Sequence, residues 1–436
     1  MDQVTAERYQ GLARHLKTVF ASDQFMERHR RSEKDFTRKR CLTFVVVIVF
    51  LLNMVKRALQ DELDEFFKVL QQRKLAGRTV TKSAFSQARQ KLKHTAFIEL
   101  NQEQVTYFYQ HFAPLRWQGL RLLAIDGSMS ELPNTQAVGE HFGVWHPRAG
   151  GTCPKARLSQ LFDVLNRLTV DALIAPKSNG ERALAERHCQ HLGERDLVLL
   201  DRGYPAFWLF ACILARGAHF CARMSISEWK VVQCFVASGV QEQLVELHPG
   251  YEARKSCRTR GLSTAPLLVR LVRIELPTGE IEVLASSLLD IAHFPYAVFK
   301  ELYSHRWPVE EDYKCMKSRL EVENWSGTSV EAIYQDFHAT IFTKNLAAIL
   351  AQPAQQVVHN QSLSKKHRYQ VNMTNLISKL KDTIVYLFCD SDVSLLLQEL
   401  WQQMIKTIEP IRPNRSCPRK KRVKRKRFST TYKQTR

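Results

Sequence analysis

Two apolar runs that each end on an aspartate constrain the fold of this chain more than any other feature. The first is "LRLLAIDGS", which ends on Asp126, and the second is "DLVLLDRGY", which ends on Asp201. Around them, strand-like and helix-like segments follow one another in the order strand, strand, strand, helix, strand, helix, strand. This order predicts an α/β core with a mixed sheet over residues 116–224.

The two aspartates lie where chemistry is common in such sheets, because a crevice opens at the carboxyl ends of strands. Each is followed within two residues by a glycine, Gly127 or Gly203. Either aspartate alone could be the first polar residue of a loop or the cap of a helix. Two of them in one sheet favour a functional site.

A third set of polar residues lies in the stretch "LYSHRWPVEEDYKCMKSRLEVE". Tyr303, Arg306, Glu310 and Lys317 occur there at offsets of three, four and seven residues. At about 100° per residue they form a narrow helical stripe beside the apolar one, which predicts side chains that face a cleft between helix and sheet. Pro308 offers an alternative in which the helix begins at that proline and the first two residues lie on a preceding turn. In the non-functional interpretation, these charged residues form surface ion pairs that contribute little to stability.

Bringing Asp126, Asp201 and Glu310 together would require cations, because three neighbouring carboxylates repel one another. Mg²⁺ suits such oxygen ligands, and we expect Mn²⁺ to substitute for it. Two such ions, about 3.5–4 Å apart, can activate a nucleophile and stabilise the leaving oxygen of a phosphodiester. Arg306 and Lys317 would then hold phosphates.

The charge of the chain points to a polyanionic partner. There are 64 Lys and Arg against 43 Asp and Glu, a formal net charge of +21. Nucleic acid is the commonest such partner, and an anionic membrane is the alternative. The longest apolar run, residues 44–52, is too short to span a membrane and reads as a buried helix or strand. The N-terminus lacks a signal-peptide pattern, so we expect a cytoplasmic protein.

Residues 1–115 are predicted to be helical and to bind DNA. The segment "SAFSQARQKL" follows Thr81, a suitable helix cap, and places apolar residues on one face. Its other face carries Arg89 and Gln90, which could reach phosphates or base edges, as in a helix-turn-helix protein. A solvated polar face is the alternative.

The rest of the chain divides by composition. Residues 225–292 are predicted to form a β-rich insertion with a hairpin around Pro277-Thr278-Gly279. Residues 293–350 complete the core, and residues 351–411 are predicted to be helical. Residues 412–436 contain "RKKRVKRKR" and no apolar period, which predicts a disordered basic tail that adds sequence-independent, salt-dependent DNA affinity.

The spacing of Tyr303, Arg306, Glu310 and Lys317 resembles the signature of the DDE transposases of bacterial insertion sequences, and more narrowly of the insertion-sequence-four family. The resemblance covers roughly residues 84–346. It takes in "SAFSQARQKL", "AIDGS", "LLDRGY", "LYSHRWPVEEDYKCMK" and "IFTKNL".

This resemblance implies a ribonuclease-H-like catalytic core interrupted by the β-rich insertion. It implies that Asp126, Asp201 and Glu310 form a metal-binding catalytic triad. Tyr303, Arg306 and Lys317 would be contacts to the DNA ends. It also implies terminal inverted repeats and target DNA as partners, with a homodimer in the synaptic complex, in a bacterial cytoplasm at the nucleoid.

The predicted function is metal-dependent cleavage and strand transfer of DNA. A nuclease that cuts without joining and a catalytically silent repressor derived from a transposase are the alternatives. A tyrosine recombinase would need Arg and His residues around Tyr303, and no such set is evident. In some relatives a Trp of the insertion stabilises a flipped base during hairpin formation, and Trp229 is the candidate here.

Overall fold

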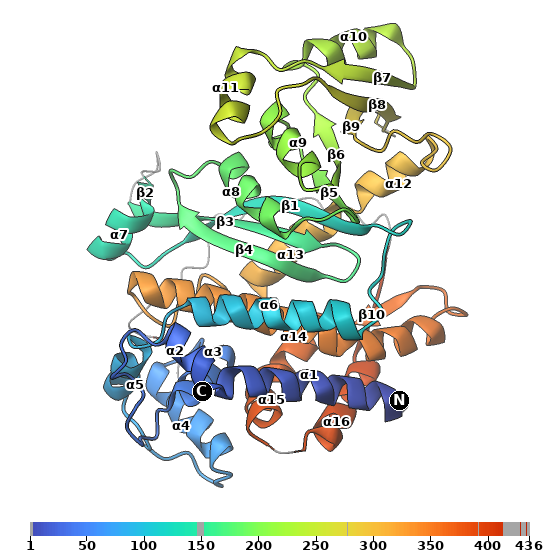
Figure 1. Cartoon of the computed structure of the whole chain (residues 1–436). Coiled ribbons are helices and arrows are strands. Elements are labelled where there is room, and N and C mark those ends of the chain that lie inside the picture. Colours follow the sequence, from blue (N-terminus) through green and yellow to red (C-terminus); the bar gives the residue numbers. More distant parts are fainter. Residues whose placement is uncertain are drawn as a thin grey trace. The chain divides into compact units, whose positions relative to one another are not determined.

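The computed structural model describes residues 3–145, 152–276, 278–390, 392–412, 428 and 433 of the chain. The chain forms two compact units, each assembled from stretches far apart in the sequence (Figure 1). The helical unit contains Met1–Ala113, Ser130–Lys155 and Cys315–Arg436, and the sheet unit contains Pro114–Met129 and Ala156–Lys314. Within the described residues, no helix has both the length and the hydropathy that crossing a membrane requires.

The N-terminal part of the helical unit is helical, as predicted. Its helices are α1 (Gln3–Ala21), α2 (Asp23–His29), α3 (Phe44–Leu52), α4 (Leu59–Leu70), α5 (Lys82–Arg89) and α6 (Thr95–His111). The side chains of Ser22, Thr43 and Thr81 cap α2, α3 and α5, each by accepting the backbone N–H of the third residue after it. Such a cap stabilises a helix by about 1 kcal/mol. The predicted cap at Thr81 is therefore confirmed.

The longest apolar run is helix α3, which is apolar all round. Val47, Ile48 and Val49 are fully buried, as expected for a helix without a polar face. It packs against α14 (Val330–Gln361), where the Thr343 hydroxyl donates to the Leu52 carbonyl at 3.0 Å. The run is thus a buried helix and not a strand.

The C-terminal part of the helical unit is also mostly helical. It contains α14, α15 (Met373–Cys389) and α16 (Ser394–Lys406). One departure from the prediction is a short antiparallel pair, β10 (Tyr369–Val371) with β11 (Ile408–Pro410). Of the predicted basic tail, residues 412, 428 and 433 are described, and the prediction for the remainder lies outside the described residues. The unit also includes α7 (Gln136–Phe142) and β2 (Val144–Trp145), which pairs with the start of β3 (Cys153–Asp163).

The sheet unit is built on three adjacent parallel strands, β1 (Arg121–Glu131), β5 (Asp196–Leu200) and β6 (His219–Met224). On one side β3 (Cys153–Asp163) neighbours β1 and pairs antiparallel with β4 (Leu168–Pro176). On the other side β9 (Ile281–Ser286) pairs antiparallel with β6. Helices α8 (Glu181–His188) and α9 (Phe207–Leu214) follow β4 and β5 in the chain, and the 3-10 turn η1 (Cys189–His191) follows α8. The predicted mixed sheet is confirmed. The predicted strands and helices occur in the predicted order, but α7 and β2, which were not predicted, lie between the first two of those strands.

The core of this unit lies between the sheet and α9. The rings of Phe210 on α9 and Phe220 on β6 stack in parallel with centroids 4.1 Å apart, and both are fully buried. Burying a phenylalanine stabilises a fold by about 1.5–3 kcal/mol. This packing joins α9 to β6 in the core of the sheet unit.

The predicted β-rich insertion contains strands and helices in the described residues. Its elements are α10 (Lys230–Ser238), β7 (Glu242–Leu247), α11 (Tyr251–Thr259), β8 (Leu267–Glu275) and β9. The predicted hairpin is present as β8 paired with β9, with Gly279 in the left-handed region at φ 81°. Pro277 lies outside the described residues. Because β9 also pairs with β6, these strands extend the core sheet and do not form a separate one.

The stretch with the Tyr-Arg-Glu-Lys spacing forms two helices. Helix α12 (Val298–Ser304) carries Tyr303, and α13 (Trp307–Ser318) begins one residue before Pro308. Proline is favoured in the first turn of a helix because a backbone N–H at that position would have no acceptor within the helix, so its absence costs nothing. The prediction of one helical stripe for all four residues is therefore wrong. Arg306 precedes the Glu310 helix, as in the alternative, but Tyr303 lies on helix α12 and not on a turn.

Candidate active site

The pairing of β1 with β5 brings the two aspartates side by side. The parallel ladder runs through Ile125 opposite Leu200, and the next residues are Asp126 and Asp201. Neighbouring strands lie about 4.8 Å apart, so the two residues are adjacent across the sheet. Asp201 follows the end of β5, as predicted. The prediction that Asp126 ends its strand is wrong, because β1 continues to Glu131 beside its second neighbour, β3.

Glu310 lies in the first turn of α13 and is paired with Arg306. The Arg306 Nη2 and Glu310 Oε1 atoms are 2.7 Å apart, and Arg306 is only 6% exposed. The Arg306 Nε atom is buried and has no hydrogen-bond partner among the described residues. The guanidinium thus has an unused donor next to the acidic residues.

The electrostatics show that these charges share one neighbourhood. The pKa of Asp126 is raised from 3.8 to about 6, mainly by burial and to a smaller extent by the negative charges of Glu310 and Asp201. The backbone N–H of Gly127 and the charge of Arg306 oppose this shift. Burial disfavours the charged form of a carboxyl group, and the two acidic neighbours add to that effect.

Two contacts fix α13 against the sheet. The Tyr313 hydroxyl donates to the backbone carbonyl of Asp126 at 3.0 Å. The Gln160 amide on β3 donates to Asp312 at 3.0 Å, and its own oxygen accepts from Thr169. The helix that carries Glu310 is therefore tied directly to the backbone of the first aspartate.

Tyr303 lies against the end of β5. Its hydroxyl donates to the carbonyl of Leu200, the residue before Asp201, at 3.4 Å. Burial raises the pKa of this hydroxyl well above its ordinary value, so it stays protonated. This protonation disfavours a tyrosine nucleophile. Lys317 is half-buried on α13, two helical turns after Glu310.

The placement of Arg89 contradicts its predicted role in DNA binding. It is 6% exposed, and its guanidinium donates to Gln335, Ser326, Asp336 and the Ala332 carbonyl at 2.6–2.8 Å. An arginine whose donors are used inside the protein does not offer them to a phosphate. The polar face of α5 is thus partly a packing surface. Gln90 is exposed, and its DNA contact stays a prediction.

Trp229 precedes α10 and is half-buried. Its ring packs near Phe210, with centroids 6.4 Å apart. Its role toward a base stays a prediction.

The donor chemistry of the carboxylate site fits a magnesium ion. Asp126, Asp201 and Glu310 offer hard oxygen ligands, and a bound cation would favour the charged form of Asp126, which burial and the two acidic neighbours disfavour. As they stand, no three or more His, Cys, Asp or Glu side chains in the described parts of the chain are close enough to hold a metal ion. The ion pair with Arg306 engages one oxygen of Glu310 in this arrangement.

Several residues around this site were not identified from the sequence. They are Arg157, Gln160, Glu181, Tyr204 and Tyr313. Tyr204 belongs to the quoted "DRGY" segment, and Tyr313 lies one helical turn after Glu310, so spacing could have indicated both. The other three come from segments distant in sequence, Arg157 and Gln160 from β3 and Glu181 from α8, and only the tertiary structure places them here.

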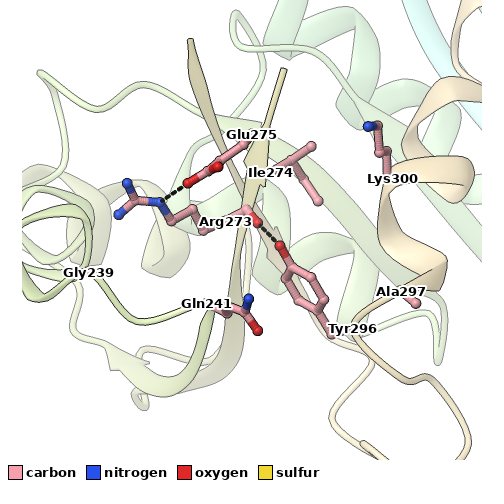
Figure 2. Close-up of a pocket in the computed structure, with 8 residues that line it drawn as sticks. All are labelled: Gly239, Gln241, Arg273, Ile274, Glu275, Tyr296, Ala297 and Lys300. Atoms are coloured by element: carbon pink, nitrogen blue, oxygen red, sulfur yellow. Dashed lines mark hydrogen bonds and ion pairs between the residues drawn. The ribbon is translucent and has the colours of Figure 1, made fainter. Parts of the chain in front are cut away.

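A separate cavity of about 420 Å³ lies elsewhere in the sheet unit (Figure 2). It is lined by Gly239, Gln241, Arg273, Ile274, Glu275, Tyr296, Ala297 and Lys300. The Tyr296 hydroxyl donates to the Arg273 carbonyl at 2.6 Å, and Arg273 Nε lies 3.6 Å from Glu275 Oε1. This lining includes neither the two aspartates nor the Tyr-Arg-Glu-Lys residues, so the cavity is distinct from the carboxylate site.

The two aspartates thus lie side by side on parallel strands, and the helix that carries Glu310 is tied to the first of them. The family model for the transposase DDE domain matches residues 117–346, and the chain belongs to this family. The resemblance stated from the sequence is therefore confirmed.

One relative is the transposase InsG for insertion sequence element IS4 of Escherichia coli (strain K12). It is 26% identical over 243 residues, which cover 56% of this chain and 54% of the relative. The chain thus matches about half the length of that protein. Among solved structures, the piggyBac transposase synaptic complex with hairpin DNA covers 93% of this chain and 87% of that chain, with a TM-score of 0.47 and 9% identity.

Proposed function

We propose that this chain is a transposase that cuts DNA at the terminal inverted repeats of its element and joins the freed 3′-hydroxyl to target DNA. Asp126, Asp201 and Glu310 would be its catalytic triad, within a ribonuclease-H-like core that residues 225–292 interrupt. The observation that carries the proposal is the adjacency of the two aspartates on β1 and β5, with α13 tied to Asp126 by Tyr313.

The three carboxylates would hold Mg²⁺, or Mn²⁺ in its place. When bound, the cation would offset charge on the phosphodiester and favour deprotonation of the attacking group. Arg306 keeps Glu310 in place before a cation is bound, and its unused Nε–H is available to a phosphate oxygen. Lys317 would add a point charge toward the DNA backbone. Tyr303 would contact the DNA end with a hydroxyl that stays protonated.

The N-terminal region and the C-terminal tail would bind DNA. Residues 1–115, including Gln90, would recognise the terminal repeats, and the tail from residue 412 would add salt-dependent affinity for any duplex. The net charge of +21 supports a nucleic-acid partner. Two copies would act together in a synaptic complex.

A strand-transfer assay tests this proposal. The substrate is linear DNA that carries the inverted repeats flanking the reading frame, together with a target plasmid and Mg²⁺. The expected products are nicks at the repeat ends and joined strands, and Asp201→Asn provides the inactive control. Cleavage without joining would indicate a nuclease, and binding without cleavage would indicate a silent DNA-binding protein.

A further inference from the structure

Tyr204 has a buried hydroxyl that no described group satisfies. The residue is 3% exposed, and its Oη atom has no hydrogen-bond partner among the described residues. It ends the turn after β5, where its backbone N–H donates to the Asp201 carbonyl at 3.0 Å. A buried donor without a partner costs about 1–3 kcal/mol, so such a group calls for an explanation.

The hydroxyl is directed at the backbone next to Asp126. A Cβ built on Gly127 would lie 3.5 Å from Tyr204 Oη and 3.6 Å from Glu181 Cγ. A Cβ on Gly203 would lie 3.9 Å from Glu181 Oε2. Glu181 therefore adjoins the glycines that follow both aspartates and is a fourth carboxylate beside the site.

Glu181 is held by a cation from the neighbouring strand. Arg157 Nη1 on β3 lies 2.7 Å from Glu181 Oε1, and the Glu181 side chain is 47% exposed. The Tyr204 pKa lies well above its ordinary value, first because of burial and then because of Asp126, Glu181 and Asp201. Tyr204 therefore remains a hydrogen-bond donor among acceptors.

We propose that Tyr204 and Glu181 are positioning residues of the carboxylate site. The Tyr204 hydroxyl donates to an ordered water molecule beside Asp126, and the Glu181 carboxylate accepts a hydrogen bond from that water. The water orients the Asp126 carboxylate for the cation. This inference rests on the proposed function.

The charges favour water over a phosphate oxygen at this position. Asp126, Asp201 and Glu181 repel an anion. Arg157 pairs with Glu181, and Arg306, whose charge also acts on Asp126, is paired with Glu310. A water molecule can donate to two carboxylates while it accepts from Tyr204, which gives it the two to four polar partners that an ordered water needs. The Glu181 side chain itself is 47% exposed and therefore in contact with solvent.

Calorimetric titration of the full-length protein with Mn²⁺ tests the inference. Tyr204→Phe should weaken Mn²⁺ binding about three- to tenfold, the size expected for one lost hydrogen bond in a charged network. It should not lower the melting temperature of the metal-free protein, because the hydroxyl has no protein partner to lose. Glu181→Gln should weaken Mn²⁺ binding similarly.

Tyr296→Phe is the matched control, since its hydroxyl does have a protein partner, the Arg273 carbonyl. It should lower the melting temperature and leave Mn²⁺ binding unchanged. A Tyr204→Phe variant that binds Mn²⁺ like the wild type, or that loses stability as Tyr296→Phe does, would overturn the inference.

The Asp126→Ala variant distinguishes failure of this inference from failure of the proposed function. Suppose that the wild type binds Mn²⁺ and Asp126→Ala does not. A Tyr204→Phe variant with wild-type Mn²⁺ affinity would then contradict this inference and leave the proposed function standing. A wild type that fails to bind Mn²⁺ defeats the proposed function as well.

Discussion

Arg89 in the helical unit and Arg306 in the sheet unit are equally buried, each 6% exposed, yet their surroundings differ. The guanidinium of Arg89 donates to four protein groups. That of Arg306 donates to Glu310, and its Nε atom has no partner within the described structure. A fully hydrogen-bonded buried charge contributes to the fold, whereas an incompletely bonded one is suited to receive a ligand.

The acidic partners of the two arginines differ in the same way. Asp336 accepts from Arg89, from the Ser326 hydroxyl and from the Ser326 backbone N–H. Glu310 accepts from Arg306 and lies near Asp126, whose pKa is raised to about 6. Saturation of hydrogen bonds therefore distinguishes a structural cluster from a candidate catalytic one better than burial does.

The largest effect should come from replacing carboxylates in the two clusters. Asp201→Asn is expected to reduce DNA cleavage more than about a hundredfold, because losing a metal ligand should exceed the 10–100-fold cost of losing an outer-shell partner. Its melting temperature should hardly change. Asp336→Asn should do the reverse, lowering the melting temperature while folded protein still cleaves. Cleavage of end-bearing DNA and thermal unfolding of both variants check this, and equal loss of cleavage in both would remove the distinction.

The arginines themselves give the next largest effect, measured as free energy of unfolding in urea. Arg89→Ala should lower it by about 3–5 kcal/mol, because Asp336 would remain buried without its cation. Arg306→Ala should lower it by about 1 kcal/mol or less, since water can reach Glu310, which is 27% exposed. Similar losses in the two variants would contradict the comparison.

A smaller effect should appear as a pH dependence in metal-free protein. The pKa of Asp126 is raised in the folded state to about 6, so folding favours its protonated form. The stability that this proton contributes is fully present below pH 3.8 and is lost as pH rises through about 6. Asp126→Asn should flatten this decline when unfolding is followed in EDTA between pH 4 and 7. A variant with the wild-type slope would show that Asp126 does not titrate there.

The smallest effect should come from Gln90, the exposed neighbour of Arg89. Gln90→Ala should leave stability within about 0.5 kcal/mol of wild type. It should weaken binding to terminal-repeat DNA up to about tenfold while leaving random duplex unaffected, if its amide reads a base edge. Titration of both duplexes at one salt concentration checks this, and an equal loss on both would assign Gln90 to the phosphate backbone.

Much of this molecule follows from local sequence. The cap at Thr81 and the β8–β9 hairpin form as neighbouring residues predict, and the run Phe44–Leu52 is buried as predicted, although its helical form was not decided by its sequence. The spacing of the Tyr-Arg-Glu-Lys residues also identified the family, because such spacing is a property of the chain and does not depend on its packing.

Tertiary structure decided which polar groups are available. Arg89 and Gln90 are neighbours on one polar face, but α14 brings Gln335 and Asp336 against the first and leaves the second exposed. Tyr204 and Glu181 are 23 residues apart in the sequence, and the sheet unit brings both beside Gly127. Hydrogen-bond saturation depends on partners distant in sequence, so periodicity cannot reveal it. The same dependence explains why β1 extends past Asp126, since its second neighbour, β3, lies more than twenty residues further along the chain.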